Sequence, residues 1–443
     1  MARGRKKENL TPEERLQAAL VPENEQPYEV PRNWCWTYLK AISKIQTGKK
    51  DANYGNNDGE YPFFTCATEP ICCHGYSFEC NAILLAGNGD INNISRYNGR
   101  FEAYQRTYVV EIVEPICIDY VFYWFKYKWF DFNKDKMFGT AIPYIRLGNL
   151  QKFPVPIPSL TQQRRIVDRI ESLFAKLDEA KQKAQDALDS FETRKAAILH
   201  KAFTGELTAQ WRKEHGVGME SWENSTVGQV CHGVKVGIVI KPSQYYTDEE
   251  KGTPAFRSAN VRENRIDDFD WVYLNDVGME INSRSIVHTG DVLVVRSGNP
   301  GTACVVSEKF DGYNAIDILI AVPDHSQISS EFLCAYTNSP FGKKLIFENK
   351  RGMALSHFNV KGYSGLPIRV PQLNEQAEII RILDDLLAKE QQAKEAAEKV
   401  LEQIDLIKKS ILARAFRGEL GTNAPSEESA VELLRQVLST SDM

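Results

Sequence analysis

One long segment occurs twice in this chain, at residues 158–207 and again at 371–420, in register and without a gap. About 19 of the 50 paired positions are identical, far more than two unrelated surface helices would share. Self-similarity over this length indicates two copies of one plan. We therefore predict that the 443-residue chain is an internal repeat.

Each copy begins with an extended proline-rich run and continues as a helix. Residues 153–158 and 366–371 carry prolines, which suit the positions just before a helix but cannot continue inside one. The apolar residues that follow recur every seven residues at two interleaved positions, as in the seam of a coiled coil. Val400 and Ile407 continue the second seam, and Glu390 interrupts it. The seam residues that we expect to hold the coil and meet partners are Ile166, Ile170, Leu173, Leu177, Phe191, Ile198, Ile379, Leu383, Leu386, Ile404 and Ile411.

Both helical runs end at matching sequence motifs, residues 202–207 and 415–420. Gly205 and Gly418 within them are the residue type expected just past a helix end. About 40 helical residues span about 60 Å, so each run is long enough to act as a spacer. Two seams of equal length favour packing against each other. The alternative is that each helix packs into the core of a globular domain.

The segments before the two helices are rich in β-branched and aromatic residues and in glycine turns, as in mixed α/β domains. The apolar runs 82–85 and 292–295 predict strands, and residues 103–105 correspond in style to 315–317. The predicted fold class is α+β, with two mixed α/β domains, two long helices and a pseudo-twofold internal repeat. The predicted boundaries are an N-terminal helical extension at 1–25, a first domain at 26–157, a central helical spacer at 158–207, a second domain at 208–370, a distal helical spacer at 371–420 and a tail with a short helix at 421–443.

Composition indicates an ordinary protein with room for two or three domains, because 42% of the residues are hydrophobic and 26% are charged. The most apolar run, Tyr120–Phe132, contains three charges and is too short to cross a membrane. The basic start, Met1–Lys7, has no apolar segment behind it, so we expect no secretory signal and a cytoplasmic location. The net charge of −5 excludes nucleic-acid binding over the whole surface. Any DNA binding must use local basic patches or a shared cleft.

Nine cysteines, an odd number spread through the chain, do not form a disulfide framework and fit reduced thiols. Cys66, Cys72, Cys73, His74 and Cys80 crowd together in the first half. Zinc sites prefer paired Cys-x-x-Cys spacing, which this cluster lacks. We expect no metal site, with metal binding as the alternative to plain thiols.

The motifs of self-contained catalysis are missing. Residues 338–341, Asn-Ser-Pro-Phe, lack a proline of the adenine-methyltransferase loop, and Gly87-Asn88-Gly89 is a poor cofactor turn. Residues 48–50 and 342–344 lack the hydroxyl residue of a phosphate-binding loop. We therefore predict a noncatalytic chain, with no cofactor of its own, whose chemistry is supplied by partners.

Basic, glycine-containing loops are the candidate DNA contacts. Residues 136–141 and 349–354 occupy matching positions before the two helices and can bring cations and backbone close to phosphates. The alternative is a solvated charged turn. The aromatic run 120–132 suggests base stacking, but a core helix is the favoured interpretation. The candidate DNA-binding residues are Lys49, Lys50, Lys136, Thr140, Arg257, Ser258, Asn260, Arg296, Lys350 and Arg351.

The order of variable domain, Pro-x-x-x-x-Gln helix, variable domain and Pro-x-x-x-x-Gln helix resembles the DNA specificity (S) subunit of Type I restriction-modification enzymes, the HsdS family. The segments that carry the resemblance are residues 156–167 and 370–380, together with the Gly-Glu-Leu helix ends. It covers nearly the whole chain. One departure is Gln162, which stands where the family has a glutamate.

The resemblance implies two target-recognition domains held apart by an antiparallel pair of long helices. Each domain would read one half of a split, asymmetric double-stranded DNA target, and the helices would fix the unread gap. The helices would also dock two methylation (M) subunits that bring S-adenosylmethionine for N6-adenine methylation. Two motor-nuclease (R) subunits using ATP and magnesium would join that core for host defence. The rival functions are a single-chain DNA methyltransferase and a coiled-coil scaffold unrelated to DNA.

Short helices are expected at both ends of the chain. Thr11 and Glu14 form a capping box with Pro12 at the first helical position, which predicts a helix through Leu20. Ser426 is predicted to start a second helix that carries Val431, Leu434 and Leu438. These helices would cover coiled-coil or partner surface, and flexible tails are the alternative.

Overall fold

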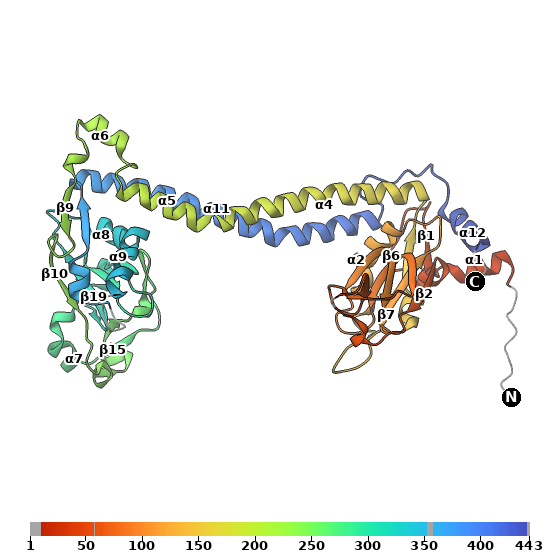
Figure 1. The fold of residues 1–443 in the computed structure, drawn as a ribbon, viewed down its shortest axis with the longest axis horizontal. Coiled ribbons are helices and arrows are strands. Elements are labelled where there is room, and N and C mark those ends of the chain that lie inside the picture. The colour runs from red at the N-terminus through yellow and green to blue at the C-terminus, as the bar shows by residue number, and fades with distance from the viewer. Residues whose placement is uncertain (1–9, 57, 352–357, 441–443) are drawn as a thin grey trace. The chain divides into compact units, whose positions relative to one another are not determined.

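The computed structural model describes residues 10–56, 58–351 and 358–440 (Figure 1). It divides into two compact units, each described separately below. Unit 1 is residues 1–184 with 399–443, and unit 2 is residues 185–398. The basic start Met1–Lys7 lies outside the described residues. Within the described ranges, no helix is long and apolar enough to cross a membrane.

The elements of unit 1, in chain order, are α1 (Pro12–Ala19), β1 (Cys35–Tyr38), β2 (Ser43–Thr47), β3 (Tyr61–Phe64), β4 (Ile71–Cys73), β5 (Phe78–Ala86), β6 (Ile94–Ala103), β7 (Thr107–Ile112), α2 (Ile118–Asn133), α3 (Leu147–Gln151), β8 (Pro154–Ile157), most of α4 (Leu160–Asp189) and α12 (Ala430–Thr440). Those of unit 2 are α5 (Phe191–Phe203), α6 (Ala209–His215), β9 (Glu223–Thr226), β10 (Cys231–Val236), β11 (Tyr246–Thr247), β12 (Thr253–Phe256), β13 (Val261–Arg262), β14 (Arg265–Ile266), β15 (Val272–Leu274), α7 (Asp276–Ile281), β16 (Val292–Val295), β17 (Ala303–Val305), β18 (Asn314–Ala315), β19 (Ile318–Pro323), α8 (Ser330–Asn338), α9 (Pro340–Arg351), α10 (Val360–Ser364) and β20 (Pro367–Val370). The long helix α11 (Leu373–Phe416) begins in unit 2 and ends in unit 1.

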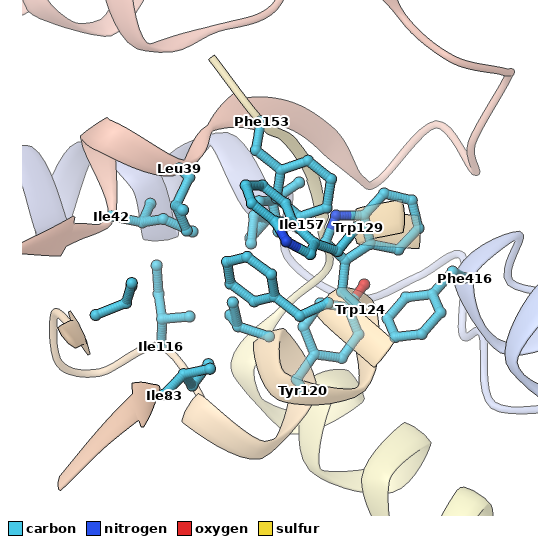
Figure 2. Packing of buried hydrophobic residues seen from close by; sticks show 14 of the residues in the cluster. Leu39, Ile42, Ile83, Ile116, Tyr120, Trp124, Trp129, Phe153, Ile157 and Phe416 are labelled. Carbon is cyan, nitrogen blue, oxygen red and sulfur yellow. The ribbon is translucent and has the colours of Figure 1, made fainter. Parts of the chain in front are cut away.

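Unit 1 is built on a six-stranded sheet in the order β2-β7-β5-β6-β3-β4, antiparallel except for the parallel pair β3–β6. Alternation along β5 sends Ile83 and Leu85 to the face that carries the main core and Leu84 to a smaller cluster on the other face. Helix α2 joins the main core with fully buried Trp124 and Trp129 (Figure 2). The run 120–132 is therefore a core helix, and the base-stacking alternative is wrong for its buried aromatics.

Unit 2 contains two four-stranded sheets, β10-β19-β16-β17 and β11-β15-β12-β18. The predicted strand 292–295 is β16, which is buried along its whole length. Alternate side chains of β16, β17 and β19 point to opposite faces of this sheet. One face packs with α8 into one core, and the other face belongs to a second core. The strand predicted at 82–85 is likewise part of β5.

The first helical run is not continuous. It divides at Ser190 into α4 and α5, so the expected unbroken helix is wrong at this point. The Ser190 hydroxyl donates to the Asp186 carbonyl at 2.8 Å, and the Arg194 guanidinium donates to the Ala187 carbonyl at 3.2 Å. Side chains that take helix carbonyls in this way interrupt the regular ladder. The second run is the unbroken α11.

Within each unit, α11 lies against the helix of the other repeat. In unit 1 the Lys408 ammonium meets the Asp178 carboxylate at 2.6 Å, and in unit 2 the Arg194 guanidinium meets the Glu390 carboxylate at 2.8 Å. Glu390, the charge that interrupts the predicted seam, thus has an ion-pair partner on the facing helix. The expected glycine ends are confirmed, since Gly205 and Gly418 have φ of +83° and +75°.

The predicted seam residues are all withdrawn from solvent. Six are buried and five are partly buried. The buried six are Ile166, Ile170, Phe191, Ile379, Leu383 and Ile404, and the partly buried five are Leu173, Leu177, Ile198, Leu386 and Ile411.

The continuation of the seam through Val400 and Ile407 is wrong, because these side chains are 39% and 42% exposed. A two-helix contact buries only a narrow stripe, which here passes through Ile404 and Leu412. Leu406 beside them is 66% exposed. These three apolar side chains of α11 are therefore left exposed.

A buried glutamine fastens the start of each long helix to its domain. The Gln163 side-chain oxygen accepts from the backbone N–H of Cys117, which precedes α2, at 2.9 Å. Gln376, its repeat partner, accepts from the backbone N–H of Ser329, which precedes α8, at 2.8 Å. Both side-chain amides also donate to a proline carbonyl at the helix start, Pro158 and Pro371. The repeated glutamine thus links each long helix to its domain.

Replacing Gln376 by leucine is expected to destabilise unit 2 by about 1–3 kcal/mol, because it leaves the partly buried Ser329 N–H and two carbonyls without their partner. Urea unfolding followed by circular dichroism measures the change. The exposed Gln372 provides the control, since its replacement by leucine is expected to cost less than about 0.5 kcal/mol. Equal losses in both variants would contradict the fastening role.

The residue before each of these glutamines forms a second anchor, and here the two units differ. In unit 2 the Glu375 carboxylate accepts from Arg212, from the Thr208 hydroxyl at 2.7 Å and from the Trp222 indole at 3.0 Å. In unit 1 Gln162 accepts from the Trp34 indole at 3.2 Å, and its amide donates to Asn423 at 2.9 Å.

Gln162, which stands where a glutamate was expected, is thus neutral and binds a neutral side chain, Asn423. The same place is charged in unit 2 and uncharged in unit 1, while the indole donor is kept in both.

The terminal helices are ordered over the described residues and pack on each other. The predicted capping box of α1 is confirmed, and Leu16 shares the unit 1 core with Leu434 of α12. The predicted start of the second helix at Ser426 is wrong, because α12 begins at Ala430. The Glu427 carboxylate binds Arg165 at 2.6 Å, which holds the preceding tail against α4.

Candidate nucleic-acid interface

Both units repeat one strand arrangement at the edge where the candidate DNA contacts gather. In unit 1 the parallel pair β3–β6 sets Phe64 opposite Ala103, and in unit 2 the parallel pair β12–β18 sets Phe256 opposite Ala315. The correspondence of residues 103–105 with 315–317 is therefore confirmed by register. The chain leaves both parallel pairs at the same edge, so the loops that follow them lie at equivalent places.

Hydrogen bonds join the loops of this edge in unit 1. The Gln105 N–H donates to the Lys50 carbonyl at 2.9 Å, and the Gly87 N–H donates to the Arg106 carbonyl at 2.8 Å. Lys49 is exposed, and the Lys50 ammonium lies 4.4 Å from the centre of the Tyr54 ring. Two adjacent lysines on a fixed loop can set register against a DNA backbone.

A small hairpin at residues 138–144 extends the same edge. Phe138 and Tyr144 exchange backbone hydrogen bonds of 2.9 and 2.8 Å, and the Gly89 N–H donates to the Pro143 carbonyl at 2.9 Å. Thr140 is exposed in this hairpin, and the Arg146 guanidinium lies 3.9 Å from the Phe138 ring centre. The structure therefore brings Thr140 close to the residue 87–89 loop.

Lys136 lies elsewhere in unit 1. It lines a hollow of about 490 Å³ with Lys40, Lys152 and Tyr38. Its ammonium lies 3.4 Å from the centre of the Phe132 ring, and burial lowers the pKa of the Lys136 ammonium. The described contacts join Lys136 to this lysine hollow and not to the loop of Lys49 and Lys50.

Two arginines dominate the edge of unit 2. The Arg257 guanidinium binds the Asp270 carboxylate at 2.7 Å, and the Arg296 guanidinium binds the Asp317 carboxylate at 3.2 Å. Among the described atoms, Nε of Arg257 and Nε of Arg296 are buried without a hydrogen-bond partner. An arginine held on one side by a carboxylate keeps its remaining donors in a fixed plane, which suits bidentate recognition of a guanine edge.

Asn260 shapes this edge from inside. It is fully buried, its side-chain oxygen accepts from the Arg257 N–H at 2.9 Å, and its amide donates to the Phe269 carbonyl at 2.8 Å. Its side chain is thus occupied in holding the turn. Ser258 is partly exposed in the same turn.

The two remaining candidates in unit 2 are at the end of α9. Lys350 and Arg351 form its last turn, and their side chains lie outside the described residues. Residues 352–354 of the matching loop 349–354 also lie outside them. The DNA contacts suggested for these residues stay predictions.

Equivalent positions of the two edges carry different side chains. Strand register places Gly87 of unit 1 where unit 2 has Arg296, because the N–H of Ile145 donates to Gly87 and that of Phe358 donates to Arg296. By the same register, Gln105 stands where unit 2 has Asp317. A shared frame with unlike loop residues gives two surfaces of different chemistry.

The sequence reasoning missed Arg106, Arg146 and Asp317. Arg106 and Arg146 are exposed on the unit 1 edge, and Asp317 takes a left-handed φ of +53° beside Arg296. Only the proximity of loops distant in sequence identifies them. The left-handed φ of Asp317 is a local sign of an unusual position, but it is visible only in the structure and not in the sequence.

No metal-binding cluster of three or more His, Cys, Asp or Glu side chains occurs in the part of the chain that the structure describes. Burial raises the pKa of the Cys80 thiol to about 11 and also raises that of Cys73. Both groups are therefore protonated thiols at neutral pH, a poor state for holding zinc.

Two repeated units, each with a mixed core, a polar edge of differing loops and a long helix, define a class of DNA-specificity proteins. The family model of the Type I restriction modification DNA specificity domain matches residues 31–188 and 219–403, well over half of the chain. The chain belongs to this family, that of the Type I restriction-modification specificity subunits.

Known proteins agree with this assignment. The specificity subunit of the Type I restriction enzyme EcoDI from Escherichia coli is 27% identical over 432 residues, covering 92% of this chain and 95% of the relative. The crystal structure of the HsdS subunit from Thermoanaerobacter tengcongensis has the same fold, with a TM-score of 0.62 and 19% identity over 89% of this chain and all of that one. A second structure, described for complex assembly and conformational transition of the type I R-M system, matches with a TM-score of 0.60, also at 19% identity and over the same shares of both chains.

Proposed function

We propose that this chain selects the DNA target of a Type I restriction-modification complex, with each unit reading one half of a bipartite, asymmetric sequence. The observation that carries the proposal is the pair of equivalent edges with unlike residues, Gly87 and Gln105 in unit 1 against Arg296 and Asp317 in unit 2. Two copies of one frame with different reading residues suit two different half-sites. Base edges in the major groove would give the choice, and lysine or arginine contacts to phosphate would set the register.

The long helices would set the length of the unread gap and dock two methylation subunits. The exposed apolar side chains Val400, Leu406 and Ile407 of α11 support docking, because a partner could bury the apolar surface that the helix pair leaves uncovered. S-adenosylmethionine, ATP and magnesium would be bound by the methylation and motor-nuclease partners. This chain would contribute no catalytic residue.

Reconstitution tests the proposal against its rivals. The chain, mixed with its methylation subunits, S-adenosylmethionine and DNA, is expected to support adenine methylation that neither component performs alone. Methyl transfer by the chain alone would favour a single-chain methyltransferase. Absence of sequence-specific DNA binding in the assembled complex would favour a scaffold.

Removing one heptad from each long helix at facing positions is expected to shorten the unread gap by about three base pairs. Seven helical residues span about 10 Å, and successive base pairs are about 3.4 Å apart. Mapping of methylated adenines by long-read sequencing measures the gap, with the half-sites as internal controls. An unchanged gap would refute the spacer role.

A further inference from the structure

The two units can be compared residue by residue beside the long helices. The strand pair β1–β8 sets Trp36 opposite Pro156, and β9–β20 sets Asn224 opposite Arg369. Pro156 and Arg369 are repeat partners, so Asn224 takes the place of Trp36. The indoles two residues earlier support this equivalence. Trp34 donates to Gln162, and Trp222 donates to Glu375, the repeat partner of Gln162.

The aromatic residues around the helix end also correspond. The Trp124 indole donates to the Pro154 carbonyl at 2.8 Å. Pro367 is the repeat partner of Pro154, and its carbonyl accepts from the Tyr336 hydroxyl. The last residues of the two helical runs are Phe416 in unit 1 and Phe203 in unit 2.

In unit 1 the space around Phe416 is filled by the chain itself. The Phe416 ring centre lies 5.0 Å from that of Trp124 and 6.0 Å from that of Tyr127 (Figure 2 shows Phe416 beside Trp124). The Tyr28 hydroxyl donates to the Phe416 carbonyl at 3.1 Å, and the Tyr28 ring packs on Trp36 at 5.1 Å. Phe416 is consequently fully buried.

In unit 2 Tyr336 takes the place of Trp124, and the other three covering aromatics are replaced by smaller residues. Strand register puts Asn224 at the position of Trp36. Counting along the chain from the matched pairs Trp34/Trp222 and Trp124/Tyr336 puts Gly216 at the position of Tyr28 and Ser339 at that of Tyr127. The result is an open hollow of about 220 Å³ next to Phe203. Its apolar lining is made by Phe203, Tyr336, Phe341, Pro367 and Ile368.

The size of the hollow suits one aromatic ring. A cavity of about 150 Å³ accepts benzene, whereas sites for drug-sized ligands begin at about 300 Å³. The equivalent hollow of unit 1 takes a tyrosine whose hydroxyl reaches a helix-end carbonyl. The Phe203 carbonyl holds the same place at the end of α5, so tyrosine is the best match.

The ring cannot come from the parts of this chain that the structure leaves undescribed. Residues 1–9, 57, 352–357 and 441–443 contain no phenylalanine, tyrosine or tryptophan. A second copy does not supply its Tyr28, because that side chain already packs inside its own unit. Tyr28, which fills the equivalent place in unit 1, is thus not free to fill the hollow of unit 2.

We propose that the hollow beside Phe203 is a docking site for a tyrosine side chain of a partner protein. Phe341 at its rim is 50% exposed, which gives an incoming ring an apolar approach. Unit 1 has no equivalent site, because Tyr28 and Trp36 close it. Identification of the partner as a methylation subunit rests on the proposed function.

The free chain tests the site without any partner. p-Cresol, which is the tyrosine side chain with Cβ as its methyl group, is expected to raise the unfolding midpoint of the wild-type chain. Asn224→Trp restores the residue that fills unit 1, so this variant is expected to melt higher than wild type and to lose the response to p-cresol. Equal responses of both proteins, or no response of the wild type, would overturn the site.

Assembly with the methylation subunits tests the partner. Asn224→Trp and Phe341→Ala are each expected to weaken binding of one subunit by about 30-fold or more, as loss of an aromatic anchor does. Glu280→Trp, which adds the same ring at an exposed position of α7, is expected to bind like wild type. Wild-type binding by both site variants would overturn the proposal. If the wild-type chain binds no methylation subunit, the proposed function fails, and the p-cresol comparison still decides the site.

Discussion

Replacing Arg212 by methionine is expected to destabilise unit 2 by about 3–5 kcal/mol. Its guanidinium binds the Glu375 carboxylate, and the two side chains are only 8% and 1% exposed. Methionine removes the positive charge and leaves Glu375 buried with only the Thr208 hydroxyl and the Trp222 indole as donors. An unpaired buried carboxylate is costly because it has lost its hydration without a compensating charge.

Urea unfolding of the full chain, followed by hydrogen exchange of β9 and β20, measures this effect in unit 2. Arg381 provides the matched control, because its pair with Glu378 is short at 2.8 Å but exposed. Arg381→Met is expected to cost less than about 1 kcal/mol. Glu375→Gln in the Arg212→Met background is expected to recover part of the loss, since it recreates the neutral arrangement of Gln162. A loss for Arg212→Met no larger than that of the control would contradict the anchor.

Replacing Arg296 by alanine is expected to reduce methylation of the cognate target by about 10- to 100-fold, which corresponds to the 1–3 kcal/mol of a bidentate contact to a base. The effect is expected only at the half-site read by unit 2. Arg296 is fixed by the Asp317 carboxylate, which also accepts from the Ser297 hydroxyl, so its loss removes a pre-positioned donor rather than a mobile charge.

Methylation rates of the reconstituted complex on targets that vary one half at a time measure the effect. Arg284→Ala removes the same charge from an exposed position of unit 2 and is expected to retain the wild-type preference. An equal loss of methylation on every sequence would indicate a phosphate contact. An unchanged preference would exclude Arg296 as a reading residue.

The long helices and their ends could be predicted from the sequence because they depend on local residue patterns. Heptad spacing predicted the buried seam residues, and glycine at the helix ends predicted the left-handed turns at Gly205 and Gly418. The capping box of α1 follows from four adjacent residues. The break at Ser190 was missed because it depends on where the Arg194 side chain points, which spacing does not encode.

The candidate site was harder to predict, since it is assembled from loops distant in sequence. The sequence named Arg257 and Arg296 as candidates but did not name the carboxylates that bind them, Asp270 and Asp317. Asn260 has the residue type of a base reader, yet its amide is consumed inside the turn. Residue type alone does not distinguish a side chain that faces DNA from one that holds the loop.

Exchange of residues 26–157 for the corresponding segment of another specificity subunit tests the central claim most directly. Long-read sequencing of host DNA then maps the methylated adenines. If each unit reads its own half-site, one half of the target changes, while the other half keeps the wild-type sequence. A change in both halves, or in neither, would contradict the division of reading between the two units.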